Sequence, residues 1–484
     1  MKKFASIAAV VGLLLASALY YGNLKKGQGP EPGPDPEPIE PVVTKPEDSA
    51  SPSTKQVVPG TLVLTSAISN GYIAQSASSD VYASVDIDAV KFQGAKRPSL
   101  NVALVIDRSG SMSGEKLRNA KQAARRLLDL LGAQDRVAIV SYSNDMTIDF
   151  ASRPVDPLNR EMMLRAIDAL AVAGGTNISE GYRGGLSEVL RWKTSETINR
   201  VILLSDGNAT LGMVTRPELE MLARDGLKRG VSMTSMGVGL DYNENIMTGM
   251  ANEGAGNYYF IDDSAAIASV FEKELKGLAS TVARNTALVI TLEQGVTLEK
   301  LYGFPYRQVG DELRISLAEF TSEQSKNVLL KLRVKGDAAG ARDVMSVKLS
   351  YGDVIHANKP THAQSTLVAV TTTDAAKVRE RVDTSVISRV QQVEIAHSMQ
   401  RAMDLYEQGA ADEAVQTITA QQERVRRARR AYKLKGESFD RVDTELSDIN
   451  RAIQAAPAAS AGGRRMIKAK KARSNYIMFD ESAF

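Results

Sequence analysis

The sequence predicts an α/β domain with a doubly wound, mostly parallel sheet, inserted in a discontinuous β-sandwich and followed by a helical region. Three observations lead to this fold. Near-continuous apolar segments alternate with amphipathic ones in the middle of the chain, which is typical of buried parallel strands covered by helices on both faces. Segments with period-two alternation flank that middle part on both sides, and a long stretch with helical periodicity follows them.

Length and composition limit the organisation and the chemistry of the chain. Its 484 residues are enough for two or three domains, and its net charge of +3 predicts no general affinity for polyanions. The absence of cysteine excludes disulfides, thiolate zinc sites and cysteine nucleophiles from this chain. We divide the chain into 1–28 (signal peptide or membrane anchor), 29–59 (proline-rich linker), 60–98 (first part of the β-sandwich), 99–281 (central domain), 282–372 (second part of the β-sandwich), 373–456 (helical region) and 457–484 (basic, flexible tail).

The N-terminus has the features of an export signal. Two lysines precede the apolar stretch 4–21, two more follow it, and Ala16-Ser17-Ala18 would suit a signal peptidase. The same stretch just reaches the length of one membrane span. Both interpretations place the rest of the chain outside the cytoplasm, in the cell envelope. We expect an N-terminal membrane anchor, with a cleaved signal and secretion as the alternative, and an extended spacer over 30–59.

The β-sandwich is predicted from strands that lie on both sides of the central domain. Val81, Val85 and Ile87 alternate with polar residues, as in a half-buried strand. The two strands predicted before the central domain cannot form a stable unit alone, so we join them to those that follow it. The predicted strands of the sandwich are 61–68, 81–90, 287–292, 312–317, 328–334 and 345–351.

The central domain is predicted to alternate strands with helices. In sheets of this kind ligands bind at the carboxyl ends of the strands. The predicted strands are 102–106, 136–142, 200–204 and 231–237, and the predicted helices are 116–131, 160–170, 180–191, 217–228 and 265–278.

Two basic clusters lie near the C-terminus, over 424–433 and 464–473. They could dock on anionic lipid, polysaccharide or acidic protein. We favour the simpler interpretation, in which the first is a solvated helix face and the second belongs to a disordered tail. Binding to nucleic acid is not expected, because aromatic residues are not interleaved with these charges.

The most informative motif follows the predicted strand 102–106. Asp107, Ser109 and Ser111 place one carboxylate and two hydroxyls at alternate positions of a loop. Thr176 and Asp206 supply two more oxygen donors downstream, and Asp206 again follows an apolar strand. Hard oxygen ligands of this kind suit Mg²⁺. Each residue alone is explained by a turn or a helix cap, but together they indicate one metal site.

This pattern resembles the metal-ion-dependent adhesion site (MIDAS) of the von Willebrand factor type A (VWA) domain family, and the match extends over about 100–280. The resemblance implies a Rossmann-like fold and a bound Mg²⁺, with Mn²⁺ or Ca²⁺ as other ions. It further implies that Ser109 and Ser111 bind the ion directly, that Asp107 and Asp206 act mostly through water, and that Thr176 is a variable ligand. An open coordination position would then accept an Asp or Glu carboxylate from a protein partner.

Three functions are compatible with these features. We favour an exported, membrane-tethered protein that binds a protein partner through Mg²⁺. A structural or assembly scaffold of a cell-envelope complex is the second, and a metal-dependent hydrolase is the third. The central domain contains neither histidine nor cysteine and no recognisable general base, so we expect no enzymatic activity and no catalytic residues. The sequence identifies neither the partner nor the oligomeric state.

Overall fold

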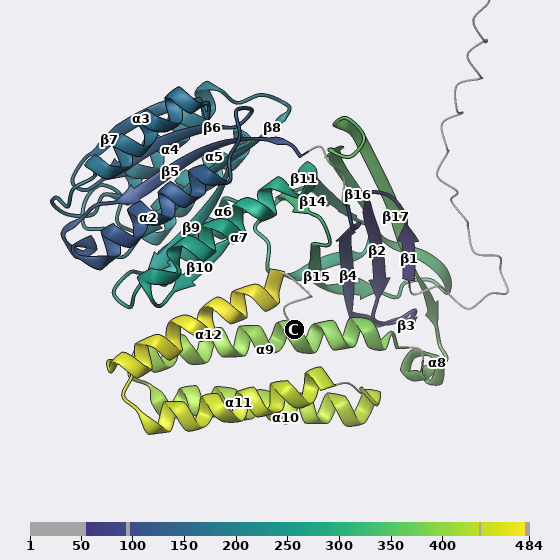
Figure 1. Ribbon diagram of the computed structural model, residues 1–484. Helices are drawn as coiled ribbons and strands as arrows, with labels where there is room; N and C mark the ends of the chain where they lie inside the picture. Colours follow the sequence, from purple (N-terminus) through teal and green to yellow (C-terminus); the bar gives the residue numbers. More distant parts are fainter. Residues whose placement is uncertain (1–54, 93–96, 381, 435–436, 480–484) are drawn as a thin grey trace, which may run out of the picture. The chain divides into compact units, whose positions relative to one another are not determined.

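The computed structural model describes residues 55–92, 97–380, 382–434 and 437–479 (Figure 1). The predicted signal peptide or anchor, and most of the predicted linker, lie outside the described residues. Within those ranges, none of the helices combines the length and the apolar character that a membrane span requires. The end of the predicted linker differs from the expectation, because strand β1 (Lys55–Val58) pairs antiparallel with β2 (Leu62–Ile68).

The central domain is built on a six-stranded sheet. Its strands are β5 (Ser99–Asp107), β6 (Arg136–Tyr142), β7 (Met146–Pro154), β8 (Thr197–Ser205), β9 (Ser232–Val238) and β10 (Tyr258–Ile261). They are arranged in the order β10-β9-β8-β5-β6-β7, and every neighbouring pair is parallel except β6 and β7. In β5, Leu104 and Ile106 enter one hydrophobic core while Ala103 and Val105 enter another. Because both faces are buried, the strand reads as a near-continuous apolar segment.

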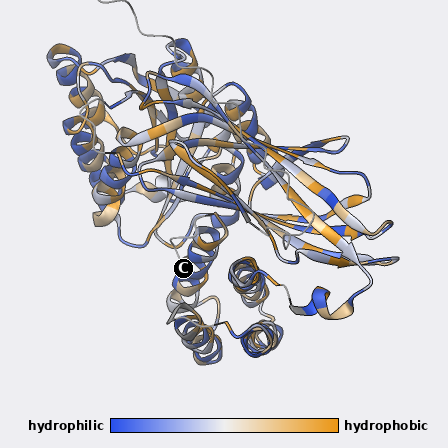
Figure 2. Cartoon of the chain, turned by 90° about the vertical axis from the view of Figure 1, so that its right-hand side faces the viewer, coloured by the Kyte–Doolittle hydropathy of each residue, from blue (hydrophilic) through white to orange (hydrophobic). Residues whose placement is uncertain are grey.

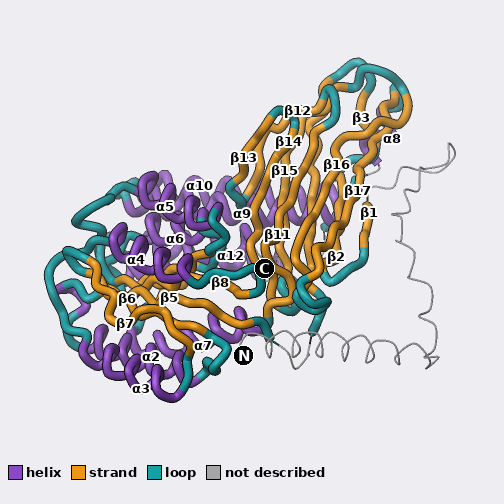
Figure 3. Tube along the Cα trace, turned by 90° about the horizontal axis from the view of Figure 1, so that it is seen from above, coloured by secondary structure: helices purple, strands orange, loops and turns teal. Residues whose placement is uncertain are grey.

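Helices cover both faces of this sheet (Figure 3). They are α2 (Glu115–Asp129), α3 (Pro157–Ala169), α4 (Ile178–Arg191), α5 (Arg216–Lys228), α6 (Glu244–Glu253) and α7 (Ile267–Ala279). Helices α2, α3 and α7 share one core with the sheet, and α4, α5 and α6 share the other. The predicted mostly parallel, doubly wound α/β fold is therefore confirmed.

The flanking strands form two sheets around a common core. The strands are β3 (Tyr72–Ala74), β4 (Ser78–Ala89), β11 (Thr281–Leu292), β12 (Val296–Tyr302), β13 (Tyr306–Val309), β14 (Glu312–Thr321), β15 (Ser325–Lys335), β16 (Gly340–Asp353) and β17 (Lys359–Thr372), in addition to β1 and β2. One sheet has the order β1-β2-β4-β15-β12, and the other has the order β13-β14-β11-β16-β17-β3. Each sheet therefore combines strands from before and after the central domain, as an insertion requires.

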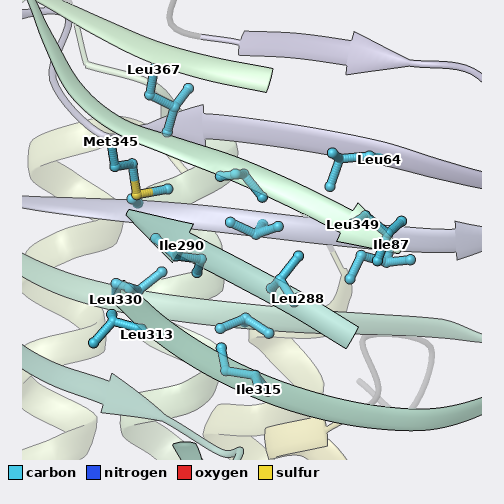
Figure 4. Close-up of a cluster of buried hydrophobic side chains, with 14 of the residues drawn as sticks. Leu64, Ile87, Leu288, Ile290, Leu313, Ile315, Leu330, Met345, Leu349 and Leu367 are labelled. Atoms are coloured by element: carbon cyan, nitrogen blue, oxygen red, sulfur yellow. The ribbon is translucent and has the colours of Figure 1, made fainter. Parts of the chain in front are cut away.

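The core of this sandwich explains the period-two pattern of its strands. Leu64, Ile87 and Leu330 from one sheet pack with Leu288 and Leu349 from the other (Figure 4). Figure 2 shows hydrophobic residues, in orange, along the strands of this sandwich. The inward positions bury apolar area, which is the main source of stability for a β-sandwich.

The C-terminal part is helical, as predicted. Its helices are α8 (Ala375–Glu380), α9 (Thr384–Glu407), α10 (Ala411–Tyr432), α11 (Glu437–Ala455) and α12 (Ala461–Phe479). Residues such as Met399, Ile418 and Leu446 form a separate core between them. The prediction of a flexible tail is wrong for 461–479, because α12 is a helix with Lys468 and Lys471 buried.

Candidate metal centre

The carboxyl ends of β5 and β8 bring the first two predicted site residues together. The strands are parallel neighbours with Ile106 paired to Leu204, so the residues that follow emerge side by side. Ser205 donates a hydrogen bond through its hydroxyl to Asp107 Oδ2 at 2.6 Å. Asp206 comes next in the chain, and both aspartates are fully buried.

The loop after β5 places the two serine hydroxyls beside these carboxylates. The backbone N–H of Ser109 donates to Asp107 Oδ1 at 2.8 Å, which fixes the start of a short 3₁₀ turn over 110–112. The buried side chain of Met112 anchors that turn. The Ser109 and Ser111 hydroxyl oxygens then lie 3.1 Å apart, and Ser111 donates to Asp206 Oδ1 at 2.7 Å.

Thr176 reaches the same place from a different loop. The N–H of Gly110 donates to the carbonyl of Gly174 at 3.0 Å, which joins the two loops. Gly174 has a φ of +52°, and a Cβ there would lie 2.6 Å from Asn144 Oδ1, so the position requires glycine. A Cβ built on Gly207 would lie 3.2 Å from Thr176 Oγ1 and 3.3 Å from Ser111 Oγ. The structure thus gathers all five predicted residues at one edge of the sheet.

Charge in this cluster is only partly balanced. Asp107 and Asp206 bring two negative charges, and Lys116 brings one positive charge with its Nζ 2.5 Å from Asp206 Oδ2. Burial raises the pKa of the Asp107 carboxyl, although the hydrogen bonds from Ser205 and Ser109 act in the opposite direction. A cation would relieve this cost, because it favours the ionised form of a nearby carboxylate.

The chemistry of the donors fits a hard divalent ion. Hydroxyl and carboxylate oxygens are the ligand types that Mg²⁺ and Ca²⁺ use. Among the described residues, no cluster of three or more histidine, aspartate or glutamate side chains could hold a metal. A metal bound at this edge would therefore depend on the serine and threonine hydroxyls.

Two residues of the cluster were missed by sequence reasoning. Lys116 lies in the first turn of α2, the helix that follows the site loop, and Ser205 directly precedes Asp206. Both could have been placed near the site from the sequence. The start of a helix after a parallel strand and the last residue of such a strand both lie at the carboxyl edge of the sheet.

Comparison with known proteins identifies the family of the central domain. Residues 101–273 match the family model of the von Willebrand factor type A domain. The uncharacterized protein YfbK of Escherichia coli (strain K12) is 31% identical over 232 residues, which cover 48% of this chain and 39% of that protein. The uncharacterized protein sll0103 of Synechocystis is 25% identical over 335 residues, which cover 65% of this chain and 77% of that protein.

The match to solved structures extends beyond the central domain. A von Willebrand factor type A protein from Catenulispora acidiphila superimposes with a TM-score of 0.68 and covers 84% of this chain and 95% of its own. The sequences are 18% identical, so this likeness concerns the fold alone. By the family match over 101–273, the central domain of this chain is a von Willebrand factor type A domain.

Proposed function

We propose that the chain binds a protein partner through a divalent ion, Mg²⁺ in the first instance, held at the carboxyl edge of the central sheet. VWA domains typically mediate protein–protein interactions and are generally not enzymes. The observation that carries the proposal is the convergence of the Ser111 hydroxyl, the Asp206 carboxylate and the Thr176 hydroxyl around Gly207. Ser109 and Asp107 extend the same network.

The roles of the five residues follow from their charge and exposure. Ser109 and Ser111 would bind the ion directly, Asp107 and Asp206 would act mostly through water, and Thr176 would be the variable ligand. Bound mainly by neutral hydroxyls, the ion would supply a strong positive charge. Ser111 is exposed, so the site is open to solvent and to a partner on that side. An Asp or Glu carboxylate of the partner would complete the coordination.

Lys116 supports the proposal because it already places a positive charge beside the carboxylates. Its ammonium group sits on Asp206 Oδ2, where it neutralises part of the charge of the carboxylates. A side-chain cation in this place offsets part of the cost of burying two carboxylates while no metal is bound. The lysine is also 28% exposed, so it can leave the carboxylate without losing a buried position.

Titration of the full-length chain with Mg²⁺ in a calorimeter tests the metal site. Ser111→Ala removes a proposed ligand and should weaken binding at least tenfold, a loss of about 1.4 kcal/mol. Ser113→Ala is the matched control, since Ser113 is also exposed in the same loop and should leave Mg²⁺ binding unchanged. If Ser111→Ala bound Mg²⁺ as tightly as the natural chain does, the Ser111 hydroxyl would not be a ligand of the ion.

A pull-down from a cell-envelope extract tests the partner. We expect partner proteins to be retained in Mg²⁺ and released by EDTA, and the Ser111→Ala chain to retain less of them at the same Mg²⁺ concentration. Retention that is unaffected by the chelator would favour the scaffold function instead.

We further propose that the chain is exported and held at a membrane by its N-terminal segment, which lies outside the described residues. The order of an apolar segment, a proline-rich acidic spacer and a binding domain supports this location. The N-terminal residue of the mature protein and the cell fraction that contains it are the test. An intact N-terminus in the cytosolic fraction would contradict export.

A further inference from the structure

A cleft of about 600 Å³ opens beside the candidate metal centre. One wall is the central-domain loop at Asp241 with the start of α6 at Asn245. The other is the end of α9 at Glu407, the turn at Ala458 and Ala459, and the start of α12. Asn208 lines the cleft and is two residues from Asp206. Because consecutive Cα atoms are about 3.8 Å apart, the Cα atom of Asn208 lies within about 8 Å of the Cα atom of Asp206.

The wall formed by α12 is held firmly against the central domain. Lys468 donates through Nζ to the carbonyl of Tyr242 at 2.7 Å and to Glu244 Oε2 at 2.6 Å, and both ionised side chains are buried. At the rim, Arg464 donates to Asp241 Oδ1 at 2.7 Å. These contacts hold the α12 side of the cleft in a fixed position.

A hydrogen bond connects the cleft to the loop of the metal centre. The side-chain amide of Asn208 donates to the carbonyl of Asp241 at 3.0 Å. The loop after β8 therefore carries Asp206 on the metal side and Asn208 on the cleft side. A ligand bound to the metal would therefore lie next to the cleft.

The lining indicates what kind of ligand the cleft accepts. Its charged residues already have partners, which are Arg464 for Asp241, Lys468 for Glu244 and Lys471 for Glu407, so the cleft does not require a charged ligand. Ala458 is half-buried and Ala459 is exposed, and both give the cleft a small apolar lining. Side-chain amides can both donate to and accept from a peptide backbone. Its volume is within the range of small-ligand pockets, roughly 300–1,000 Å³, which is room for a few residues.

We propose that the cleft binds an uncharged, extended stretch of the partner polypeptide whose acidic residue binds the metal. This inference rests on the proposed function. An extended chain advances about 3.3–3.6 Å per residue, so the stretch begins about two or three residues from the acid. The partner-binding surface is then composite, with the metal centre from the VWA domain and one wall of the cleft from the C-terminal helical region.

A peptide array tests the proposal with the full-length chain. The probes are twelve-residue peptides with one central Glu and otherwise uncharged, randomised positions, and binding is compared in Mg²⁺ and in EDTA. Ala459→Trp fills the cleft and should weaken the Mg²⁺-dependent peptides about tenfold, with Mg²⁺ affinity in the absence of peptide unchanged. Ala431→Trp, at an exposed position of α10, is the matched control and should change neither quantity.

The selected peptides give a second measurement. On the natural chain, alanine substitutions two or three positions from the Glu should weaken binding, and on Ala459→Trp they should have no further effect. Unchanged or tighter peptide binding by Ala459→Trp would overturn the proposal while leaving Mg²⁺-dependent binding intact. An array with no Mg²⁺-dependent binder would instead overturn the proposed function, and this inference with it.

Discussion

Two clusters of buried charge in this molecule differ in how their charges are paired. At the start of α6, Glu244 has Lys468 Nζ 2.6 Å from Oε2 and Lys471 Nζ 3.0 Å from Oε1, and all three side chains are buried. At the carboxyl edge of the sheet, Asp107 is equally buried, but its oxygens accept hydrogen bonds from the N–H of Ser109 and the hydroxyl of Ser205. Those donors carry no charge.

The difference separates a structural cluster from a binding site. Burial by itself would raise the pKa of Glu244, but the hydrogen bonds and charges of Lys468 and Lys471 lower it overall. The pKa of Asp107 is raised, because burial outweighs its neutral donors. A carboxylate with built-in counter-charges stabilises the fold, whereas one without them is stabilised when a cation arrives from solution.

The largest effect that can test this comparison is expected at the α12 junction. Glu244→Gln keeps the shape of the side chain but removes the charge that Lys468 and Lys471 share. Loss of one partner from a buried ion pair costs about 3–5 kcal/mol, so the free energy of unfolding should fall by that amount. Denaturant titration of the full-length chain measures it.

A control in the same helix and a change of pH sharpen the result. Glu253 pairs with Arg224, which is 48% exposed, so Glu253→Gln should cost less than about 1 kcal/mol. Because the pKa of Glu244 is lowered in the folded state, its stabilisation is present above the unfolded pKa, near 4.5, and is lost as the pH falls through the folded pKa. The penalty of Glu244→Gln should therefore shrink on acidification. A penalty that does not change with pH would contradict this pairing.

At the carboxyl edge of the sheet, the same kind of substitution should not lower the free energy of unfolding when Mg²⁺ is absent. Without Mg²⁺, Asp107→Asn removes a buried charge held by neutral donors, so the chain should be unchanged or more stable by up to about 1 kcal/mol. With Mg²⁺ at a hundred times its Kd for the natural chain, that chain should gain about 2.7 kcal/mol, and the variant should gain less. Thermal unfolding in Mg²⁺ and in EDTA measures both effects.

Asp145→Asn provides the matched control for that experiment. Asp145 is exposed in the loop between β6 and β7, close in sequence to Asn144 of the site loops. Its variant should keep the full stabilisation by Mg²⁺. If Asp107→Asn without Mg²⁺ lost as much stability as Glu244→Gln, the two clusters would be of one kind and the comparison would fail.

The fold was predictable where local pattern and burial agree. The strand β6 was predicted with its observed bounds, because its apolar residues form one uninterrupted buried segment. Strands β7 and β10 were missed. The first has mixed exposure along its length, and the second has only four residues, so neither shows a clear period. Helix α6 was also missed, because it is short and contains Gly249, a residue of low helix propensity.

The site was predictable from spacing, but its partners were not. Asp107 and Asp206 could be placed together, since both follow parallel strands of one sheet. The basic cluster of α12 was misinterpreted as part of a disordered tail, because Lys468 meets Glu244 from 224 positions away along the chain. No local pattern reports such a contact. The sequence places Lys116 at the carboxyl edge of the sheet, but its ion pair with Asp206 became evident only in the structure.

Lys116 allows the smallest and most specific test of the comparison, because it is the one residue that makes the edge cluster resemble the α12 junction. Its ammonium competes with a divalent ion for Asp206, so Lys116→Met should tighten Mg²⁺ binding about tenfold, or about 1.4 kcal/mol, in calorimetric titration. Lys121→Met, in the same helix but with its Nζ on the exposed carbonyl of Asp168, should leave the affinity unchanged. Weaker Mg²⁺ binding by Lys116→Met would mean that the lysine holds Asp206 in position rather than competing for it. The edge cluster would then carry a structural ion pair of the same kind as the one at Glu244.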